Sequence, residues 1–159
     1  MVMSSFTGRH WLLAVAGLCI ASIAAALVGQ YAFDMQPCPY CILQRLVYAV
    51  IAVLSLIGAF VPGAGRRLLA GLVAVLALAA GAAALYQHFV AAKSASCAFT
   101  FADKIITALR IDEFAPSLFA VRASCADAAV SVLGVPFEMW SLLLAVLALA
   151  CSITAVKRP

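Results

Sequence analysis

Cys38 and Cys41 form a C-x-x-C pair that directly precedes an apolar stretch of the chain. Such a pair is typical of redox-active thiols or of a metal site, and an apolar stretch of about twenty residues is typical of a membrane span. Together they predict a dithiol at the edge of a lipid bilayer, with Arg45 one helical turn further in. Passing electrons between protein thiols and a lipid-soluble carrier is one of the few chemistries that use this arrangement.

The other cysteines are Cys19, Cys97, Cys125 and Cys151. We interpret Cys19 and Cys151, which lie inside apolar stretches, as small packing residues. A zinc site is disfavoured, because structural zinc usually shows two closely spaced ligand pairs. Structural disulfides suit Cys97 with Cys125, but a disulfide within C-x-x-C closes too short a loop to stabilise much. Thiol–disulfide exchange accounts for all four remaining cysteines, whose pairing stays open because four cysteines allow three connectivities.

The surroundings of Cys41 favour a reactive thiolate. We expect Cys41 at the start of a helix, where unpaired backbone N–H groups carry partial positive charge. Arg45 follows at i+4 and so lies on the same helix face. An arginine near the apolar region indicates function, and the alternative is an anchor whose long side chain reaches the membrane surface. For His88, an ordinary position at the membrane surface is the alternative to a functional role.

The composition of the chain indicates that lipid surrounds most of it. Of 159 residues, 67% are hydrophobic and only 10% are charged, with a mean hydropathy of +1.17, whereas soluble domains carry about 25% charged residues. The net charge of +4 does not indicate a nucleic-acid partner, because the basic residues are scattered or flank apolar segments. We interpret this charge as a signal of membrane topology.

Four segments have the roughly twenty apolar residues that a bilayer core requires: residues 11–31, 42–61, 68–90 and 136–156. In lipid each must be a helix, because its backbone groups have to be satisfied within the segment. The chain is therefore predicted to be an all-α membrane protein, a single domain over residues 1–159 built as an antiparallel bundle of four transmembrane helices. The first segment is too long for a cleaved signal peptide, so we expect it to be retained.

Charged residues predict the orientation of this bundle. Arg9, the pair Arg66 and Arg67, and the pair Lys157 and Arg158 lie in short flanks on one side. The positive-inside rule places that side, with both termini, in the cytoplasm. The loops at about residues 32–41 and 91–135 then face outward, where disulfides persist. In the second loop, Phe101, Ile105, Ile106 and Leu109 mark one face of a short amphipathic helix, predicted to lie on the membrane surface or against the top of the bundle.

Reduction potentials indicate which molecule finally accepts the electrons. An outward-facing thioredoxin-fold oxidant has a reduction potential near −120 mV, and cytosolic glutathione lies well below it. Electrons from such a partner would have to move energetically uphill to reach the cytosolic pool. A membrane quinone is the available alternative at the bilayer edge, and a cationic side chain there would stabilise developing negative charge on it.

Several short motifs carry a resemblance to a known family. They are Pro37-Cys38-Pro39-Tyr40-Cys41, Gln44-Arg45, Tyr86-Gln87-His88, Ala95-Ser96-Cys97-Ala98-Phe99, Ser124-Cys125-Ala126, Leu133-Gly134 and Met139-Trp140. With the four spans, they make the chain resemble the disulfide bond formation protein B (DsbB) family of bacterial inner-membrane, quinone-dependent thiol oxidases over essentially its whole length. Two details depart from the expected pattern: Pro39-Tyr40 fills the dipeptide between the cysteines, and Gln44 stands in place of an acidic residue.

The resemblance implies a two-stage relay. A reduced periplasmic thioredoxin-fold dithiol oxidase of the DsbA type would attack Cys97, and Cys125 would exchange with Cys38. Cys41 would face a quinone, either ubiquinone or menaquinone, with Arg45 assisting it and His88 as a further contact. The expected location is the bacterial inner membrane. The alternative from a different class is a non-enzymatic four-span membrane protein whose disulfides only brace its loops.

Overall fold

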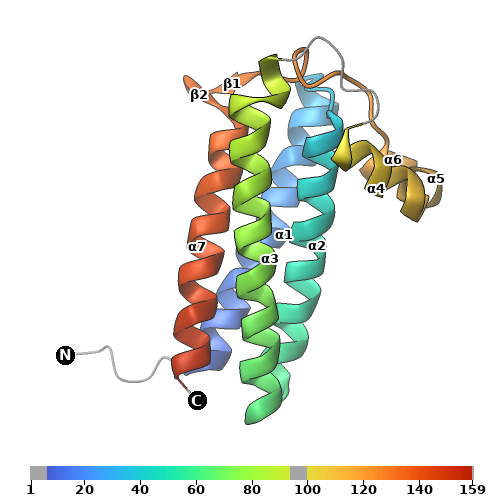
Figure 1. Cartoon of the computed structure of the whole chain (residues 1–159). Helices are drawn as coiled ribbons and strands as arrows, with labels where there is room; N and C mark the ends of the chain where they lie inside the picture. The colour runs from blue at the N-terminus through green and yellow to red at the C-terminus, as the bar shows by residue number, and fades with distance from the viewer. Residues whose placement is uncertain (1–6, 94–99, 159) are drawn as a thin grey trace.

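The computed structural model describes residues 7–93 and 100–158, and nearly all of its regular structure is helical (Figure 1). Cys97 lies outside these residues. The elements in chain order are α1 (Gly8–Ala32), α2 (Pro39–Phe60), α3 (Ala64–Phe89), the 3-10 helix η1 (Ala91–Lys93), α4 (Phe101–Leu109), α5 (Ile111–Phe114), α6 (Pro116–Phe119), β1 (Ser131–Val132), β2 (Val135–Pro136) and α7 (Phe137–Lys157).

The four long helices α1, α2, α3 and α7 form an antiparallel bundle in which each helix packs against two neighbours, in the cyclic order α1, α2, α3, α7. All four are long and apolar enough to cross a membrane, which confirms the predicted fold class. Three helices begin earlier than predicted, α1 at Gly8, α2 at Pro39 and α3 at Ala64. Apolar runs mark only the lipid-immersed part of a helix, whereas its hydrogen bonding continues through polar residues to the cap.

Small side chains allow α3 and α7 to approach closely. Ala77 and Ala80 on α3 and Ala145 and Ala148 on α7 are all buried in the main core. At Gly81, an added Cβ would lie 3.5 Å from the Cβ of Ala145, so the two backbones are already at contact distance. Close packing of small residues is the usual means of joining helices in lipid, where no hydrophobic effect drives them together. Cys19 is buried in this same core and Cys151 packs against it, as expected of packing residues.

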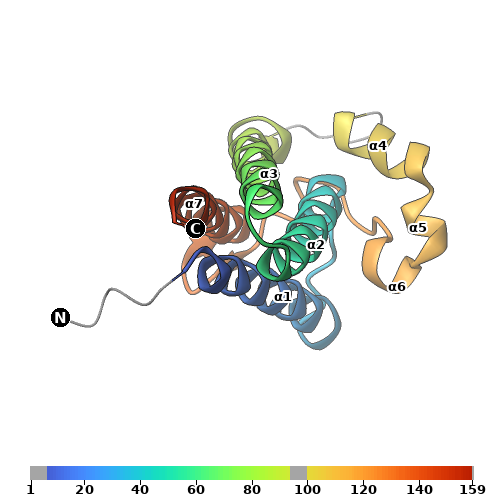
Figure 2. The ribbon, with the colours of Figure 1, turned by 90° about the horizontal axis from the view of Figure 1, so that it is seen from below.

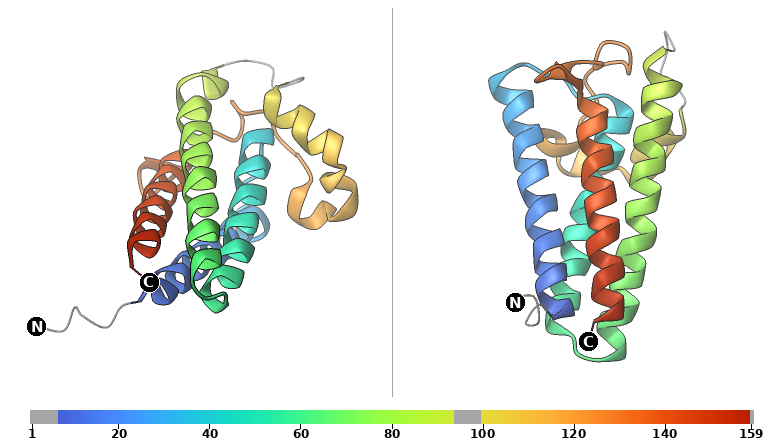
Figure 3. Two further views of the ribbon diagram at one scale, coloured as in Figure 1. Left: turned by 60° about the horizontal axis from the view of Figure 1, so that its bottom comes forward. Right: turned by 90° about the vertical axis from the view of Figure 1, so that its left-hand side faces the viewer.

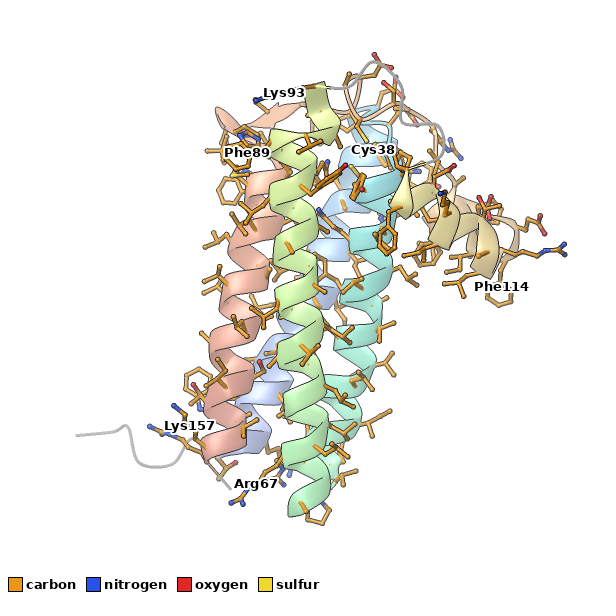
Figure 4. All side chains as sticks on the ribbon, in the orientation of Figure 1. Cys38, Arg67, Phe89, Lys93, Phe114 and Lys157 are labelled. Atoms are coloured by element: carbon orange, nitrogen blue, oxygen red, sulfur yellow. The ribbon has the colours of Figure 1, made fainter. Side chains whose placement is uncertain are left out.

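The two ends of the bundle differ in composition. Both termini and the turn between α2 and α3 lie at one end, near Arg67 and Lys157, which we call the basic end (Figures 3 and 4). At that turn Gly63 adopts a φ of +65°, a conformation that favours glycine. Cys38 lies at the opposite end, which we call the cysteine end (Figure 4). The segregation agrees with the topology expected from sequence, and the assignment of the basic end to the cytoplasm stays a prediction.

Short elements cover the cysteine end. Helices α4 to α6 lie beside α2, on the side away from α7 (Figure 2). The predicted amphipathic helix is confirmed as α4, but its apolar residues divide between two directions: Ala102 and Ile106 are buried, whereas Phe101 and Leu109 are 68% and 58% exposed. Thr100 caps the helix, since its Oγ1 accepts a hydrogen bond from the Asp103 amide at 3.3 Å.

A β-hairpin that sequence reasoning did not anticipate precedes α7. Strand β1 pairs with β2 in antiparallel fashion, with Val132 opposite Val135. The two connecting residues, Leu133 and Gly134, have φ values of +56° and +79°. Two consecutive positive φ values are the mark of the tight turn whose twist matches that of a hairpin. This hairpin lies at the cysteine end above α7 (Figure 1).

Candidate redox site

Cys38 and Cys41 lie in the first turn of α2, where the local sequence sets their geometry. Cys38 is the N-cap residue, and its sulfur accepts a hydrogen bond from the Cys41 amide at 3.3 Å. Pro39 occupies the first helical position, for which its fixed φ is suited. The two Sγ atoms are 2.8 Å apart. The C-x-x-C spacing thus brings both sulfurs to one helix terminus, as the sequence predicts.

The long loop brings Cys125 against Cys38. The backbone amides of Arg122 and Ala123 both donate to the Pro37 carbonyl, at 3.0 and 3.2 Å, which docks this part of the loop on the residue before the motif. Cys125 follows in a turn and is 1% exposed. Its side chain shares a hydrogen bond with that of Cys38. The hydrogen bonds with Cys125 and Cys41, together with burial, raise the pKa of the Cys38 thiol above its ordinary value of 9.0.

Cys41 faces a different environment, an apolar cavity of about 360 Å³. This cavity lies between α1, α2 and α7 under the β-hairpin, and Cys41 is one of its walls. Its lining residues are Ser22, Ile23, Ala25, Ala26, Cys41, Gln44, Arg45, Tyr48, Val132, Leu133, Phe137, Trp140, Ser141 and Leu144. The two sulfurs of one motif therefore face two different neighbours, a cysteine of the loop and an apolar cavity.

Arg45 borders the cavity beside Cys41, on the helix face that the i+4 spacing predicts. Its side chain is buried, with 6% exposure. Nη1 donates to Gln30 Oε1 at 3.0 Å and to the Leu118 carbonyl of α6. Nε is buried and has no hydrogen-bond partner among the described residues. The arginine is thus held inside the protein by two acceptors, rather than extended to the surface as the anchor interpretation requires.

His88 lies at the same end but does not line the cavity. Its Nδ1 is 2.8 Å from Oε1 of Glu138, a buried residue in the first turn of α7. This contact joins α3 to α7 and would be an ion pair when the imidazole is protonated. The predicted quinone contact of His88 receives no support from this placement and stays a prediction.

Two glutamines that sequence reasoning did not select lie against the dithiol. Gln87 of α3 donates from Nε2 to Cys41 Sγ at 3.4 Å and to Cys38 Sγ at 3.6 Å. Gln44 of α2, a residue of the cavity wall, donates from Nε2 to Gln87 Oε1 at 3.1 Å. Neither glutamine carries a charge, the feature that makes Arg45 and His88 stand out in the apolar spans. Uncharged amides inside apolar segments are also costly to bury and would have indicated the site.

The dipeptide between the cysteines also contributes to the packing. Tyr40 is buried, and its ring lies 5.4 Å from that of Tyr86 on α3, measured between ring centroids. This aromatic contact fixes the start of α2 against α3, next to the Gln87 amide. Within residues 7–93 and 100–158, no group of three or more His, Cys, Asp or Glu side chains is placed so that it could hold a metal ion.

Comparisons with known proteins agree with this arrangement. Residues 8–155 match the family model described as disulfide bond formation protein DsbB. The chain is 34% identical to disulfide bond formation protein B 1 of Pseudomonas syringae pv. syringae over 95% of its own length and 93% of the relative's. It is 32% identical to disulfide bond formation protein B of Burkholderia pseudomallei, over 87% and 83% of the two chains. The corresponding protein of Nitrosospira multiformis is 31% identical, over 91% and 89%.

Proposed function

The chain belongs to the DsbB family of disulfide bond formation proteins, and we propose that it reoxidises a periplasmic thioredoxin-fold dithiol oxidase of the DsbA type and passes the electrons to a membrane quinone. Family membership and the four apolar helices make it a multi-pass membrane protein with a disulfide oxidoreductase role. That role argues against the alternative of loop disulfides that only brace the protein. The partner, the quinone and an inner-membrane location with cytoplasmic termini belong to the proposal.

The observation that carries the proposal is the division of surroundings between the two sulfurs of one motif. Cys38 is hydrogen-bonded to Cys125 of the long loop, whereas Cys41 is a wall of the apolar cavity. A relay between a water-exposed protein partner and a lipid-soluble acceptor needs a dithiol with one sulfur toward each. Direct thiol–disulfide exchange requires attack of one sulfur on another, and the contact between Cys38 and Cys125 supports exchange between these two.

Each step of the relay balances in electrons. A thiolate of the partner attacks Cys97 of a Cys97–Cys125 disulfide, and completion of this exchange leaves the partner oxidised and these two cysteines reduced. Cys125 then attacks Cys38 of the Cys38–Cys41 disulfide and releases Cys41 as a thiolate. Cys97 attacks Cys125 of this mixed disulfide, which restores the Cys97–Cys125 disulfide and leaves Cys38 and Cys41 as the reduced pair. When the Cys38–Cys41 disulfide forms again, two electrons and two protons leave the dithiol. A quinone supplies the acceptor for both, becoming the quinol.

The residues around the cavity fit a quinone ring. The volume of about 360 Å³ lies in the range of small-molecule pockets, ~300–1,000 Å³. Quinone carbonyls are hydrogen-bond acceptors, and the buried Nε–H of Arg45 is a donor with no partner among the described residues. Arg45 would therefore orient the ring and stabilise negative charge on its oxygen. The walls that surround Cys41 are mostly apolar.

A turnover assay with the full-length protein in detergent tests the proposal. Reduced thioredoxin-fold partner and excess short-chain quinone are added, and quinone reduction is followed by absorbance. We expect turnover in the wild type and a loss on the order of 10³-fold or more in Cys41→Ser and Cys97→Ser, the scale seen when a nucleophile is removed. Cys151→Ser is the matched control, because Cys151 packs on the core away from the cavity. Unchanged turnover in either of the first two variants would refute the mechanism.

A further inference from the structure

Two buried amides lie against the dithiol, and the relay described above does not use them. Gln87 and Gln44 are only 3% and 5% exposed. They come from different helices, and among the described residues their side chains hydrogen-bond to each other and, through Gln87, to the two sulfurs of the motif. Burying an amide in an apolar bundle is unfavourable unless its hydrogen bonds are made. Here the dithiol is one of the groups that satisfies them.

We propose that Gln87 is a positioning residue that stabilises the reduced Cys38–Cys41 pair by donating its amide N–H groups to both sulfurs, with Gln44 fixing the orientation of that amide. The inference rests on the proposed function, since it requires that the pair cycle between disulfide and dithiol. It adds two residues to the site and assigns a different task to each.

The first step of the argument concerns the direction of the hydrogen bonds. A glutamine amide has one acceptor end and one donor end with two N–H groups. Because Gln44 Nε2 donates to Gln87 Oε1, the acceptor end of Gln87 is occupied and its donor end faces the sulfurs. A thiolate can only accept hydrogen bonds, so this orientation matches the reduced, ionised state of the pair.

The second step concerns where negative charge develops. Each exchange releases one sulfur of the pair as a thiolate in a mostly apolar site, where an ion without donors is strongly disfavoured. Arg45 is held by Gln30 and Leu118 on the cavity side. Gln87 lies within 3.6 Å of both sulfurs, so its N–H groups can follow the charge from one sulfur to the other without a rearrangement of helices.

The third step concerns the identity of Gln44. A carboxylate at this position could not donate to Gln87 Oε1, because an ionised carboxylate only accepts. It would also place a second negative charge near the thiolate. Gln44 is a cavity wall residue as well, so the amide chain joins the cavity to the sulfurs. The neutral residue that departs from the expected family pattern is therefore the one that orients Gln87.

The equilibrium between the Cys38–Cys41 pair and a defined thiol–disulfide buffer tests this inference. The full-length protein is equilibrated in detergent, free thiols are alkylated, and the peptide that contains both cysteines is quantified by mass spectrometry. Stabilising the reduced form makes a dithiol pair more oxidising. For Gln87→Met, which keeps the volume but has no N–H, we expect a shift toward the disulfide of about tenfold, or about 30 mV for a two-electron couple. For Gln44→Met we expect a smaller shift in the same direction.

Ser152→Ala is the control, because Ser152 is buried on α7 and its hydroxyl bonds only a carbonyl of its own helix. It should leave the equilibrium unchanged. A wild-type equilibrium in Gln87→Met, even with a lowered unfolding temperature, would overturn the inference and leave Gln87 as a packing residue. If Gln87→Met does not fold, a wild-type equilibrium in Gln44→Met overturns it. A wild-type pair that never becomes reduced would instead refute the proposed function, and neither partner nor quinone is needed to see the difference.

Discussion

The two ends of the bundle bury different kinds of side chain. At the cysteine end the described buried polar residues are Gln30, Gln44, Arg45, Gln87 and Glu138, whereas toward the basic end they are Ser55 and Ser152. The basic half is packed by apolar residues, one from each long helix: Leu12, Ala59, Ala70 and Ala155. Large polar groups are expensive to bury in a membrane protein and tend to mark function. The basic half therefore mainly holds the helices together, whereas the cysteine half contains the buried charged and amide side chains.

Arg45 gives the strongest test of this separation. We expect Arg45→Met to lower quinone reduction by ~10²-fold, because it removes the only described cation that borders the cavity with Cys41 and preorganised donors of this kind contribute on that scale. Arg45→Lys should restore little, since a lysine has no counterpart to the Nε–H that we assign to the quinone. The measurement is steady-state turnover at saturating partner. Arg122→Met, at an exposed arginine of the same end, is the control, and an equal loss there would contradict the assignment.

Cys38 tests whether the cysteine end holds one thiol of the pair protonated. Because hydrogen bonds with Cys125 and Cys41 and burial raise the pKa of Cys38, the folded, reduced protein keeps this proton at a pH where the unfolded chain gives it up. The contribution of Cys38 to stability is therefore present below pH 9.0 and lost as the pH rises above it. We expect a thiolate-specific alkylating reagent to modify Cys38 at least ~10-fold more slowly in the folded than in the denatured protein near pH 9, since only the thiolate reacts.

That measurement uses mass spectrometry of the labelled peptide over a range of pH. Cys125→Ala removes the partner that contributes most to the raised pKa, and it should speed the alkylation of Cys38. An alkylation rate in the folded wild type that follows the ordinary titration of a thiol around pH 9.0 would show that the end does not protect this proton.

Ala145, in the core at the middle of the bundle, tests the packing of the helices and should have the smallest effect on catalysis. Ala145→Leu inserts a large side chain where α3 and α7 are in contact, and overpacking of this kind costs about 1–3 kcal/mol in the free energy of unfolding. We expect a lower midpoint of unfolding in denaturant and turnover close to that of the wild type. Ala150→Leu, at an exposed position of the same helix, should change neither. A loss of turnover with unchanged stability in Ala145→Leu would break the separation.

Apolar runs were enough to predict the four helices, because lipid forces such segments into helices whatever their neighbours. The spacing of Cys41 and Arg45 likewise predicted one helix face, and both residues line the cavity. The contacts across the chain were not accessible in this way. Gln87 is 46 residues from Cys41 in sequence, and only the packing of α2 against α3 brings them together.

The short elements of the cysteine end show a second limit. Leu133 takes a positive φ next to Gly134, which a leucine seldom does, so the hairpin turn carries no strong sequence signal. The apolar residues of α4 fit one helix face, yet Phe101 and Leu109 are exposed because α2 covers only part of that face. The role of Cys97 stays a prediction from the family resemblance.

The hydrogen bond from Arg45 to the Leu118 carbonyl joins residues 73 apart in the chain. The same side chain borders the cavity, so Arg45 connects the long loop to the cavity. Displacing α6 would remove one of the two described acceptors of Nη1, Gln30 Oε1 being the other, at a cost on the order of 1–3 kcal/mol. The guanidinium would then be freer to turn toward an acceptor bound in the cavity. A pull on the long loop outside the bilayer would in this way move the positive charge of Arg45 inside it.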